Sequence, residues 1–420
     1  MARFTNYAIV VGANYGDEGK GLITDYLTEF MRARYNARFN GGAQAGHTVE
    51  REGKRHVFST YGAGTFNDVQ TVLTPNVVIN PFAALKEQEM LLGLGVVPDR
   101  LLISRQSPVT TQWDMAINQI SEQLRRDARH GSCGLGINET ITRHLEGLSV
   151  KQPAVYGTLF DENDEWLRWI GKNHFPRRLV KLNIAMMMSE EHWQRELNMY
   201  EERASEFREL MVRCKDTIFD FQPLASGPIV YEGAQGLGLD EFMGEFPHVT
   251  RSNCGIGNAL DHIATQGGDR VTAVYVTRTY LTRHGAGPLK NEMPVENVLG
   301  YKYVDETNVT NEYQQNFRYA PLHIPNLVAR ISKDIARNAA RVKDYGMSFT
   351  PYIAVTHMNT IYKPAVVVKD GEDPIQLSPE EIVEEIEKQA GTIKVGFRSW
   401  SRSSAGVETS GSVKKVLSLV

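Results

Sequence analysis

Short apolar runs alternate with amphipathic stretches along most of the chain. Apolar runs bounded by glycine, proline or polar residues predict strands at 7–13, 71–79, 228–232, 271–277 and 351–356. Apolar positions at helical spacing predict helices at 20–34, 81–93, 111–129, 189–214, 257–266, 322–341 and 379–390. Such alternation predicts an α/β fold, with a large, mainly parallel central sheet and helices on both faces.

No repeat, low-complexity tract or linker divides the chain, so we expect one large domain over residues 1–420. The stretch 155–215 interrupts the alternation with the segment DENDEWLRWIGKNHFPRRL and a charged helical pattern. We interpret it as a helical insertion beside the sheet and as a candidate subunit contact. The last twenty residues are rich in Ser and Gly, and their periodicity predicts no element.

Composition narrows the class of protein. With 41% hydrophobic and 23% charged residues the chain is globular, and a net charge of −4 gives no basic surface for nucleic acid. No apolar run reaches the roughly 18 residues of a membrane span, and no signal-peptide pattern precedes the first strand. Three sparse cysteines without metal-ligand spacing fit a reducing compartment, so we expect a cytoplasmic protein.

The stretch GANYGDEGKG, residues 12–21, follows a predicted strand and opens a predicted helix. Strand, glycine-rich turn, Lys20 and helix together predict a phosphate-binding loop, because backbone N–H groups at a helix start face an anion. The ordinary loop places Ser or Thr after its lysine to hold Mg²⁺, whereas this chain has Gly21. An acidic pair, Asp17 and Glu18, lies inside the loop instead. Two acids there would repel a phosphate unless a metal or a proton transfer is involved.

Four further stretches hold more glycine and polar residues than packing requires. Each has a plain interpretation as a turn, a loop tie or a structural histidine. Taken together, at the ends of predicted strands, they indicate one site assembled from distant loops. The stretches are GGAQAGHT (41–48), GSCGLGINET (131–140), YEGAQGLGLD (231–240) and TRHGAGPLKNE (282–292).

These motifs resemble those of the adenylosuccinate synthetase family. GDEGKG, GG..AGHT, EGAQG..LD, FPHVTRSN and TR.GAGP..NE occur in the family's order and at roughly its spacing, from about residue 7 to about residue 360. The resemblance implies a large α/β domain, a homodimer and a Mg²⁺-dependent ligase. In the family, GTP phosphorylates the 6-oxygen of IMP, and the amine of aspartate then displaces the phosphate.

The resemblance also implies roles for individual residues. Asp17 would be the base that takes the proton from N1 of the purine, and it would hold Mg²⁺ together with the carbonyl of Gly46. Lys20 would neutralise phosphoryl charge, His47 would be the general acid, and Gln235 would contact the purine nucleotide. The remaining nucleotide contacts implied by the motifs are Gly16, Glu18, Gly19, Gly21, Gln44, Ala45, Thr48 and, for the 5′-phosphate, Thr250 with Ser132 and Cys133.

The chain departs from the family at the 5′-phosphate. The family has two threonines where this chain has Ser132 and Cys133, and a thiol is the poorer donor. The family also reaches across the dimer with an arginine shortly after this loop. Arg143 is the candidate here, at a shorter spacing.

A second departure concerns the phosphate donor. The family reads guanine with Thr-Lys-Leu-Asp, whereas this chain has Thr356, His357, Met358 and Asn359 at the matching place. A carboxylate accepts two hydrogen bonds from guanine, while an amide can both donate and accept. Asn359 therefore suits adenine at least as well, so the donor is expected to be ATP or GTP. His357 and Asn359 are the candidate nucleotide contacts in this segment.

A third departure concerns the amine donor. The family's arginine-rich aspartate loop corresponds to TNVTNEYQQNFRYAPL, residues 307–322, where Arg318 is the only basic residue. Thr310, Asn311 and Arg318 are therefore the candidate aspartate contacts. The alternative that the amine donor is a molecule other than aspartate stays open.

Three alternatives to the IMP ligase remain. The related 2-aminoadenylosuccinate synthetases act on GMP or dGMP with ATP or dATP, although retention of Asp17 argues for a hypoxanthine base. A catalytically silent nucleotide-binding paralogue is disfavoured by the joint presence of Asp17, Lys20, His47 and Gln235. A GTPase switch is disfavoured by the missing hydroxyl at Gly21.

Overall fold

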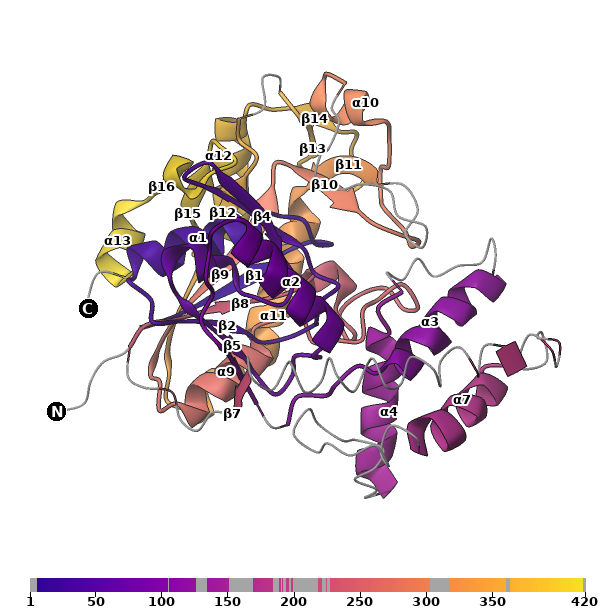
Figure 1. The fold of residues 1–420 in the computed structure, drawn as a ribbon. Coiled ribbons are helices and arrows are strands. Elements are labelled where there is room, and N and C mark those ends of the chain that lie inside the picture. The colour runs from indigo at the N-terminus through magenta and orange to yellow at the C-terminus, as the bar shows by residue number, and fades with distance from the viewer. Residues whose placement is uncertain are drawn as a thin grey trace.

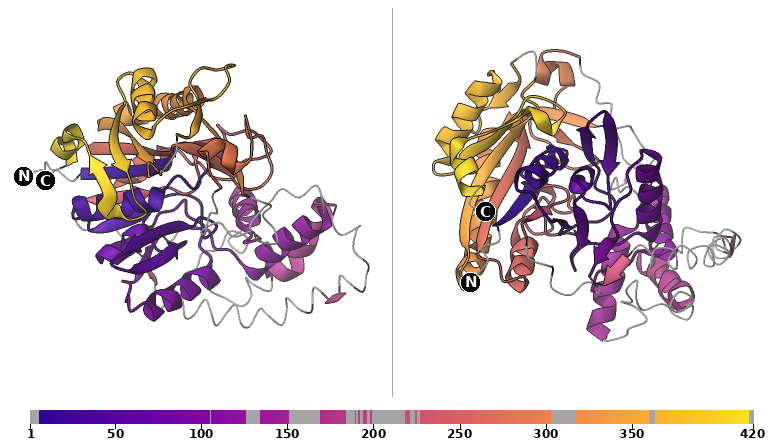
Figure 2. Two further views of the ribbon diagram at one scale, coloured as in Figure 1. Left: turned by 90° about the horizontal axis from the view of Figure 1, so that it is seen from above. Right: turned by 60° about the vertical axis from the view of Figure 1, so that its left-hand side comes forward.

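The computed structural model describes residues 6–104, 106–125, 134–150, 169–183, 218–220, 227–302, 317–359 and 363–417, with single residues at 189, 191, 194, 195, 198 and 224. A large central sheet is flanked by helices, with a group of helices, α3, α4 and α7, beside it (Figure 1). The same group lies at one side of the molecule in two further views (Figure 2), where α3 and α7 share a hydrophobic core with β5 and β6.

Ten strands of the described residues form the central sheet, in the order β16-β15-β12-β9-β1-β8-β2-β5-β6-β7. All neighbours are parallel except β16, which runs antiparallel to β15. The strands are β1 (Asn6–Gly12), β2 (Tyr35–Arg38), β5 (Gln70–Leu73), β6 (Leu101–Ile103), β7 (Ile218–Asp220), β8 (Ile229–Glu232), β9 (Arg270–Arg278), β12 (Ser348–Thr356), β15 (Lys394–Ser399) and β16 (Val407–Thr409).

Two smaller sheets accompany the central one. A hairpin joins β3 (His47–Arg51) to β4 (Lys54–Phe58), and a four-stranded sheet has the order β10-β11-β13-β14. Its strands are β10 (Tyr280–Arg283), β11 (Arg318–His323), β13 (Ala365–Val367) and β14 (Ile375–Gln376). The helices are α1 (Lys20–Phe30), α2 (Pro81–Gly93), α3 (Gln112–Arg125), α4 (Ile137–Val150), α7 (Phe175–Lys181), α9 (Gly257–Thr265), α10 (Val295–Leu299), α11 (Ile324–Asp344), α12 (Pro379–Ala390) and α13 (Gly411–Leu417).

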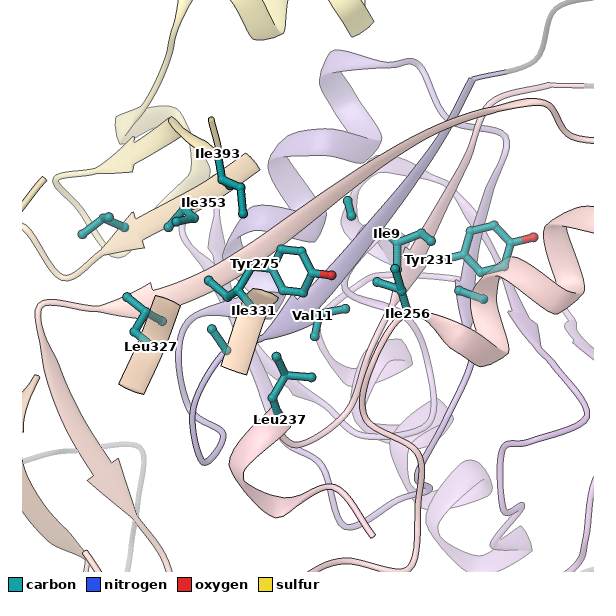
Figure 3. Packing of buried hydrophobic residues seen from close by; sticks show 14 of the residues in the cluster. Ile9, Val11, Tyr231, Leu237, Ile256, Tyr275, Leu327, Ile331, Ile353 and Ile393 are labelled. Carbon is teal, nitrogen blue, oxygen red and sulfur yellow. The ribbon is translucent and has the colours of Figure 1, made fainter. Parts of the chain in front are cut away.

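Alternate residues of β1 enter two different cores, because successive side chains of a strand point to opposite faces. Ile9 and Val11 belong to the cluster that includes residues of α9, α11 and α12, such as Leu260 and Ile331; part of this cluster is drawn in Figure 3. Val10 packs instead with apolar residues of α1 and α13. Both faces of the sheet are therefore covered, which explains why its central strands read as continuous apolar runs.

The predicted fold class is confirmed. The five predicted strands correspond to β1, β5, β8, β9 and β12 with altered ends, whereas the other five strands of the central sheet were not predicted. The strand predicted at 71–79 ends at Leu73, where Thr74 and the donor-less Pro75 follow. The helix predicted at 20–34 ends at Phe30, because Arg32 adopts a left-handed backbone, φ 48°. The helix predicted from 322 begins at Ile324, where the His323 side chain caps it by accepting from Asn326 N–H.

Other expectations concern the insertion and the C-terminus. Most of 155–215, including the helix predicted at 189–214, lies outside the described residues, although 170–181 is helical. The serine- and glycine-rich tail forms β16 and α13 at one edge of the central sheet. None of the described helices is long and apolar enough to cross a membrane.

Candidate active site

The loop between β1 and α1 folds around the side chain of Glu18. Glu18 is 2% exposed, and its Oε1 accepts from the N–H groups of Asn14 (3.0 Å) and Gly16 (2.8 Å). Its Oε2 pairs with Nζ of Lys20 at 2.8 Å. One acid of the predicted pair is thus an internal anion that holds the loop and orients Lys20. Left-handed backbone at Gly16 (φ 98°), Asp17 (59°) and Gly19 (90°) lets the chain turn tightly around it.

The missing hydroxyl after Lys20 has a steric explanation. A Cβ added at Gly21 would lie 2.8 Å from Cβ of His47, a contact that real structures do not show. His47, the first residue of β3, therefore stands directly against the start of α1. A serine or threonine would displace it.

His47 is oriented by Glu232, the last residue of β8. Its Nδ1 is hydrogen-bonded to Oε1 of Glu232, while Oε2 accepts from Ala63 N–H at 3.0 Å. Burial raises the pKa of Glu232, but the charges of His47 and Arg38 outweigh it and hold that pKa below its usual range. Burial lowers the pKa of His47 despite the opposing charge of Glu232. Because an ionised carboxylate only accepts, Nδ1 carries the hydrogen, and Nε2 is the ring atom left for a ligand.

Asp17 is held from two sides. Its backbone carbonyl accepts from Nε of Arg278, and its Oδ2 lies 3.2 Å from Nε2 of His284. Burial raises the pKa of Asp17, but the hydrogen bond and charge of His284, with Arg278 and Lys20, outweigh it and lower the pKa to about 2. Asp17 is consequently a carboxylate over the whole physiological range.

A first pocket lies beside this loop, with a cavity of about 180 Å³. Its wall includes the loop between β1 and α1 and the segment 356–359, which was predicted to contact the base of the donor. It also includes Ser401 and Arg402, from the C-terminal stretch for which the sequence predicted no helix or strand. Its lining residues are Asp17, Gly19, Lys20, Gly21, Leu22, Gly46, His47, Thr48, Glu50, Arg278, Tyr280, Tyr301, Thr356, His357, Asn359, Ser399, Ser401 and Arg402.

A second and larger pocket, with a cavity of about 850 Å³, extends toward α3, α4 and α7. Of the predicted nucleotide contacts, it is lined by Gly16, Asp17, Lys20, Gln44, Ala45, Gly46, His47, Thr48, Gln235 and Thr250. Both amide atoms of Gln44 are buried without a hydrogen-bond partner among the described residues. Buried amides are normally paired, so this orphan indicates a polar ligand in the pocket.

Five residues line both pockets: Asp17, Lys20, Gly46, His47 and Thr48. A group bound in the first pocket and a group bound in the second therefore meet at a carboxylate, an ammonium and an imidazole. This is an arrangement for transfer between two ligands, with charge neutralisation and proton transfer at the junction.

Other predicted residues lie elsewhere. Arg143 is 1% exposed and paired with Asp114 at 2.9 Å, and it lines neither pocket. Arg318 also lines neither pocket; its guanidinium is paired with Glu292 and donates to the carbonyls of Gly285 (3.0 Å) and Gly287 (2.7 Å). The predicted residues Ser132, Cys133, Thr310 and Asn311 lie outside the described residues.

A family profile described as Adenylosuccinate synthetase matches residues 9–317. The chain belongs to the adenylosuccinate synthetase family. The protein named adenylosuccinate synthetase 2 of Chromobacterium violaceum is 31% identical over 299 residues, 70% of this chain and 66% of the relative. The chain thus spans just under two thirds of the length of that curated relative. The family binds IMP, GTP and aspartate and is generally Mg²⁺-dependent.

Two solved structures share the fold. The fully ligated adenylosuccinate synthetase of Plasmodium falciparum aligns with a TM-score of 0.64 and 20% identity, covering 96% of this chain and 99% of that one. The succinoaminodeoxyadenylate synthetase PurZ of cyanophage S-2L, bound to dGMP and to dATP as energy donor, aligns with a TM-score of 0.62 and 15% identity over 99% of each chain. At these identities the likeness concerns the fold alone.

The family's Mg²⁺ would find few protein ligands here. The described residues contain no cluster of three or more His, Cys, Asp or Glu side chains able to hold a metal. Asp17 and Gly46 nevertheless line both pockets. Mg²⁺ is commonly bound by one or two carboxylates together with substrate phosphates and water, so these residues fit a phosphate-bridged ion.

Sequence reasoning missed several site residues. Glu232 could have been noticed as an acid closing the apolar run PIVYE, and His284 as the histidine within TRHGAGP. Arg278 and Arg402 lie in none of the glycine-rich motifs of the sequence. They reach the first pocket because β9 and β15 end at the same edge of the sheet as β1.

Proposed function

We propose that the protein is a ligase that joins the amine of aspartate to C6 of a purine 5′-monophosphate, most simply IMP, driven by ATP or GTP. The observation that carries the proposal is the set of five residues shared by the two pockets. A triphosphate in the first pocket and a monophosphate in the second would react at these residues. The orphaned amide of Gln44 and the family membership support the same conclusion.

The first step would activate the purine oxygen. Asp17 takes the proton from N1, the N–H electron pair moves into the ring, and O6 attacks the γ-phosphorus while the bond to the β-phosphate oxygen breaks. Lys20 stabilises the charge that develops there, and His47 does so when Nε2 carries a proton and the ring is an imidazolium beside Glu232. In the second step, the free amine nitrogen forms the bond to C6, the C6–O6 bond breaks, inorganic phosphate leaves with the former O6, and the nitrogen gives up one proton to the departing phosphate.

Mg²⁺ would supply charge neutralisation between the phosphates, held by Asp17 and the carbonyl of Gly46. The remaining assignments rest on the resemblance: a homodimer in the cytoplasm, with Thr250, Ser132 and Cys133 at the 5′-phosphate and Thr310 and Asn311 at the amine donor.

A second candidate is the same chemistry on GMP or dGMP with ATP or dATP. Asn359, which lines the first pocket in place of the family's aspartate, favours an adenine donor. Asp17 at the reacting edge favours an acceptor without a 2-amino group.

One experiment separates these candidates. The protein is incubated with IMP, GMP, dIMP or dGMP, with aspartate and either ATP or GTP, and the succinyl adduct is sought by mass spectrometry. We expect an adduct of IMP that disappears in Asp17→Asn, since loss of a positioned base costs about 10²–10⁴ in rate. No adduct in any combination, with nucleotide binding intact, would instead indicate a silent paralogue.

A further inference from the structure

The imidazole of His284 faces the carboxylate of Asp17. Nε2 of His284 lies 3.2 Å from Oδ2 of Asp17, and both side chains line the second pocket. They are 28% and 23% exposed, so the pair lies in the pocket wall rather than in the core. An ion pair at such exposure contributes only about 0–1 kcal/mol to stability. Stabilisation of the fold therefore does little to explain why His284 contacts Asp17.

The surrounding structure fixes the position of the imidazole. Its ring packs against Phe317, with centroids 4.5 Å apart. The segment that carries it is held by Arg318, which donates to the carbonyls of Gly285 and Gly287 and is itself anchored by Glu292. Pairing of β10 with β11 places His284 directly after the last strand residue. The loop 284–287, held by Arg318, thus fixes the imidazole of His284 beside Asp17.

Asp17 needs such a contact because its own backbone leaves the carboxylate more than one orientation. The backbone is fixed by a left-handed conformation and by the hydrogen bond from Arg278 to the carbonyl oxygen. These limit the allowed rotamers of Asp17, but they do not hold its carboxylate in a single orientation. A donor at Oδ2 does restrict that orientation, and it leaves Oδ1 as the oxygen for a proton of the substrate.

We propose that His284 is a positioning residue for the catalytic base: its Nε2–H holds Oδ2 of Asp17, so that Oδ1 is presented to the N1–H of the acceptor purine. The inference rests on the proposed function. A donor on a base reduces its basicity, so the contact is useful only because accurate placement of reacting atoms contributes more than the lost proton affinity.

Two substitutions of His284 separate the hydrogen bond from the shape of the ring. His284→Gln keeps an N–H donor at nearly the same reach, whereas His284→Val removes it. His144→Val, on α4 and outside both pockets, is the matched control for loss of a histidine. Each variant is assayed for kcat, for the KM values of all substrates, and for monophosphate binding by calorimetry.

We expect His284→Val to lower kcat by about 10- to 100-fold, because a displacement of about 1 Å in a reacting group can cost about 10²-fold in rate. Monophosphate binding and the nucleotide KM values should stay near those of wild type. His284→Gln should recover most of kcat, and His144→Val should be unaffected. A merely structural role would instead change binding and melting temperature together, without rescue by Gln.

Three results would overturn the inference. Wild-type kcat in His284→Val would show that Asp17 needs no donor. Equal losses in the Val and Gln variants would assign the effect to the ring rather than to the hydrogen bond. A wild-type protein that forms no adduct with any acceptor would overturn the proposed function and this inference with it, whereas active wild type with unaffected His284→Val would overturn this inference alone.

Discussion

Nδ1 of His47 donates a hydrogen bond to the carboxylate of Glu232, a fully buried acid at the last position of β8. The contact links the β3–β4 hairpin to the central sheet at the junction of the two pockets. It leaves Nε2 of His47 for a ligand. A carboxylate in this place also favours the imidazolium that forms when His47 accepts a proton.

Glu232→Gln should therefore lower kcat. The amide keeps the shape but not the charge, and its N–H₂ opposes the N–H of Ala63 or the hydrogen on Nδ1. We expect a loss of about 10- to 100-fold with nucleotide dissociation constants nearly unchanged. Steady-state kinetics and calorimetry would measure the two. Glu87→Gln is a matched control, because Glu87 contacts His56 at 3.4 Å outside both pockets; it should change stability but not kcat. Equal kcat losses in both variants would contradict the argument.

Gly21→Ser would restore the ordinary phosphate-loop residue. The new Cβ would lie 2.8 Å from Cβ of His47, so we expect His47 to be displaced and kcat to fall despite the added hydroxyl. Gly21→Ala introduces the same Cβ without the hydroxyl and should lose a similar amount. Higher activity in the serine variant than in wild type would show that the loop tolerates the hydroxyl and that the steric explanation fails.

The fold class and the central-sheet strands β1, β5, β8, β9 and β12 were predictable because their signals are local. Apolar runs of β1 and β9 and the spacing of apolar residues in α1 depend on which residues follow one another. Lys20 stood out for a related reason, since it lies in a glycine-rich turn directly after β1, whereas the role expected of His47 came from the family resemblance.

The partners of these residues were not predictable, because pairing across the sheet leaves no local pattern. Glu232 and His284 are single residues whose contacts depend on strand order and register. Arg143 illustrates the converse: the resemblance implied a nucleotide contact despite a shorter spacing, and no local pattern indicated that Asp114 lies beside it in a buried pair. The elements of the C-terminal twenty residues were not predicted, because β16 and α13 contain too few residues to show a periodic pattern of apolar positions.

Substitution of Arg318 tests whether its hydrogen bonds to the loop 284–287 are needed to hold His284 in position. Arg318→Ala removes the donors to Gly285 and Gly287, so we expect a fall in kcat similar to that of His284→Val. The KM values of both nucleotides should change little. A rise in the KM of aspartate with unchanged kcat would instead assign Arg318 to the amine donor, as its place in the sequence suggested. Glu292→Gln would support that outcome if it lowered the aspartate KM by releasing the guanidinium.

Asp334 on α11 should make stability depend on pH. Burial raises the pKa of Asp334 to about 6, against the hydrogen bonds from Tyr275 and Ile256 that lower it. Because the folded pKa exceeds the usual 3.8, the folded state holds this proton more tightly, and the stability contribution falls as pH rises through that interval.

The comparison with Asp334→Asn isolates this effect. The amide cannot ionise, so the variant should gain stability relative to wild type as pH rises from about 4 to about 7, by on the order of 2–3 kcal/mol. Melting temperatures of both proteins across this range would measure the change. A difference that is independent of pH would mean that Asp334 ionises as easily in the folded protein as in the unfolded chain.

Asn359 lines the first pocket together with His357, Ser401 and Arg402, where the proposed triphosphate base would bind. An amide can donate one hydrogen bond and accept another, which matches adenine, whereas a carboxylate accepts both hydrogen bonds offered by guanine. Asn359→Asp should therefore move the preference from ATP toward GTP. A changed hydrogen-bond pattern is worth on the order of 1–3 kcal/mol, so the ratio of the two kcat/KM values should shift by roughly 5- to 150-fold.

The measurement is kcat/KM for ATP and for GTP with the same acceptor and aspartate. Asn359→Ala is the matched control, because it removes the amide without adding a carboxylate; it should weaken discrimination without favouring GTP. Strong preference of the wild-type protein for GTP would show that Asn359 does not read adenine. An unchanged ATP/GTP ratio in Asn359→Asp would place the base of the donor against other residues of the pocket, of which Ser401 and Arg402 would be the next to substitute.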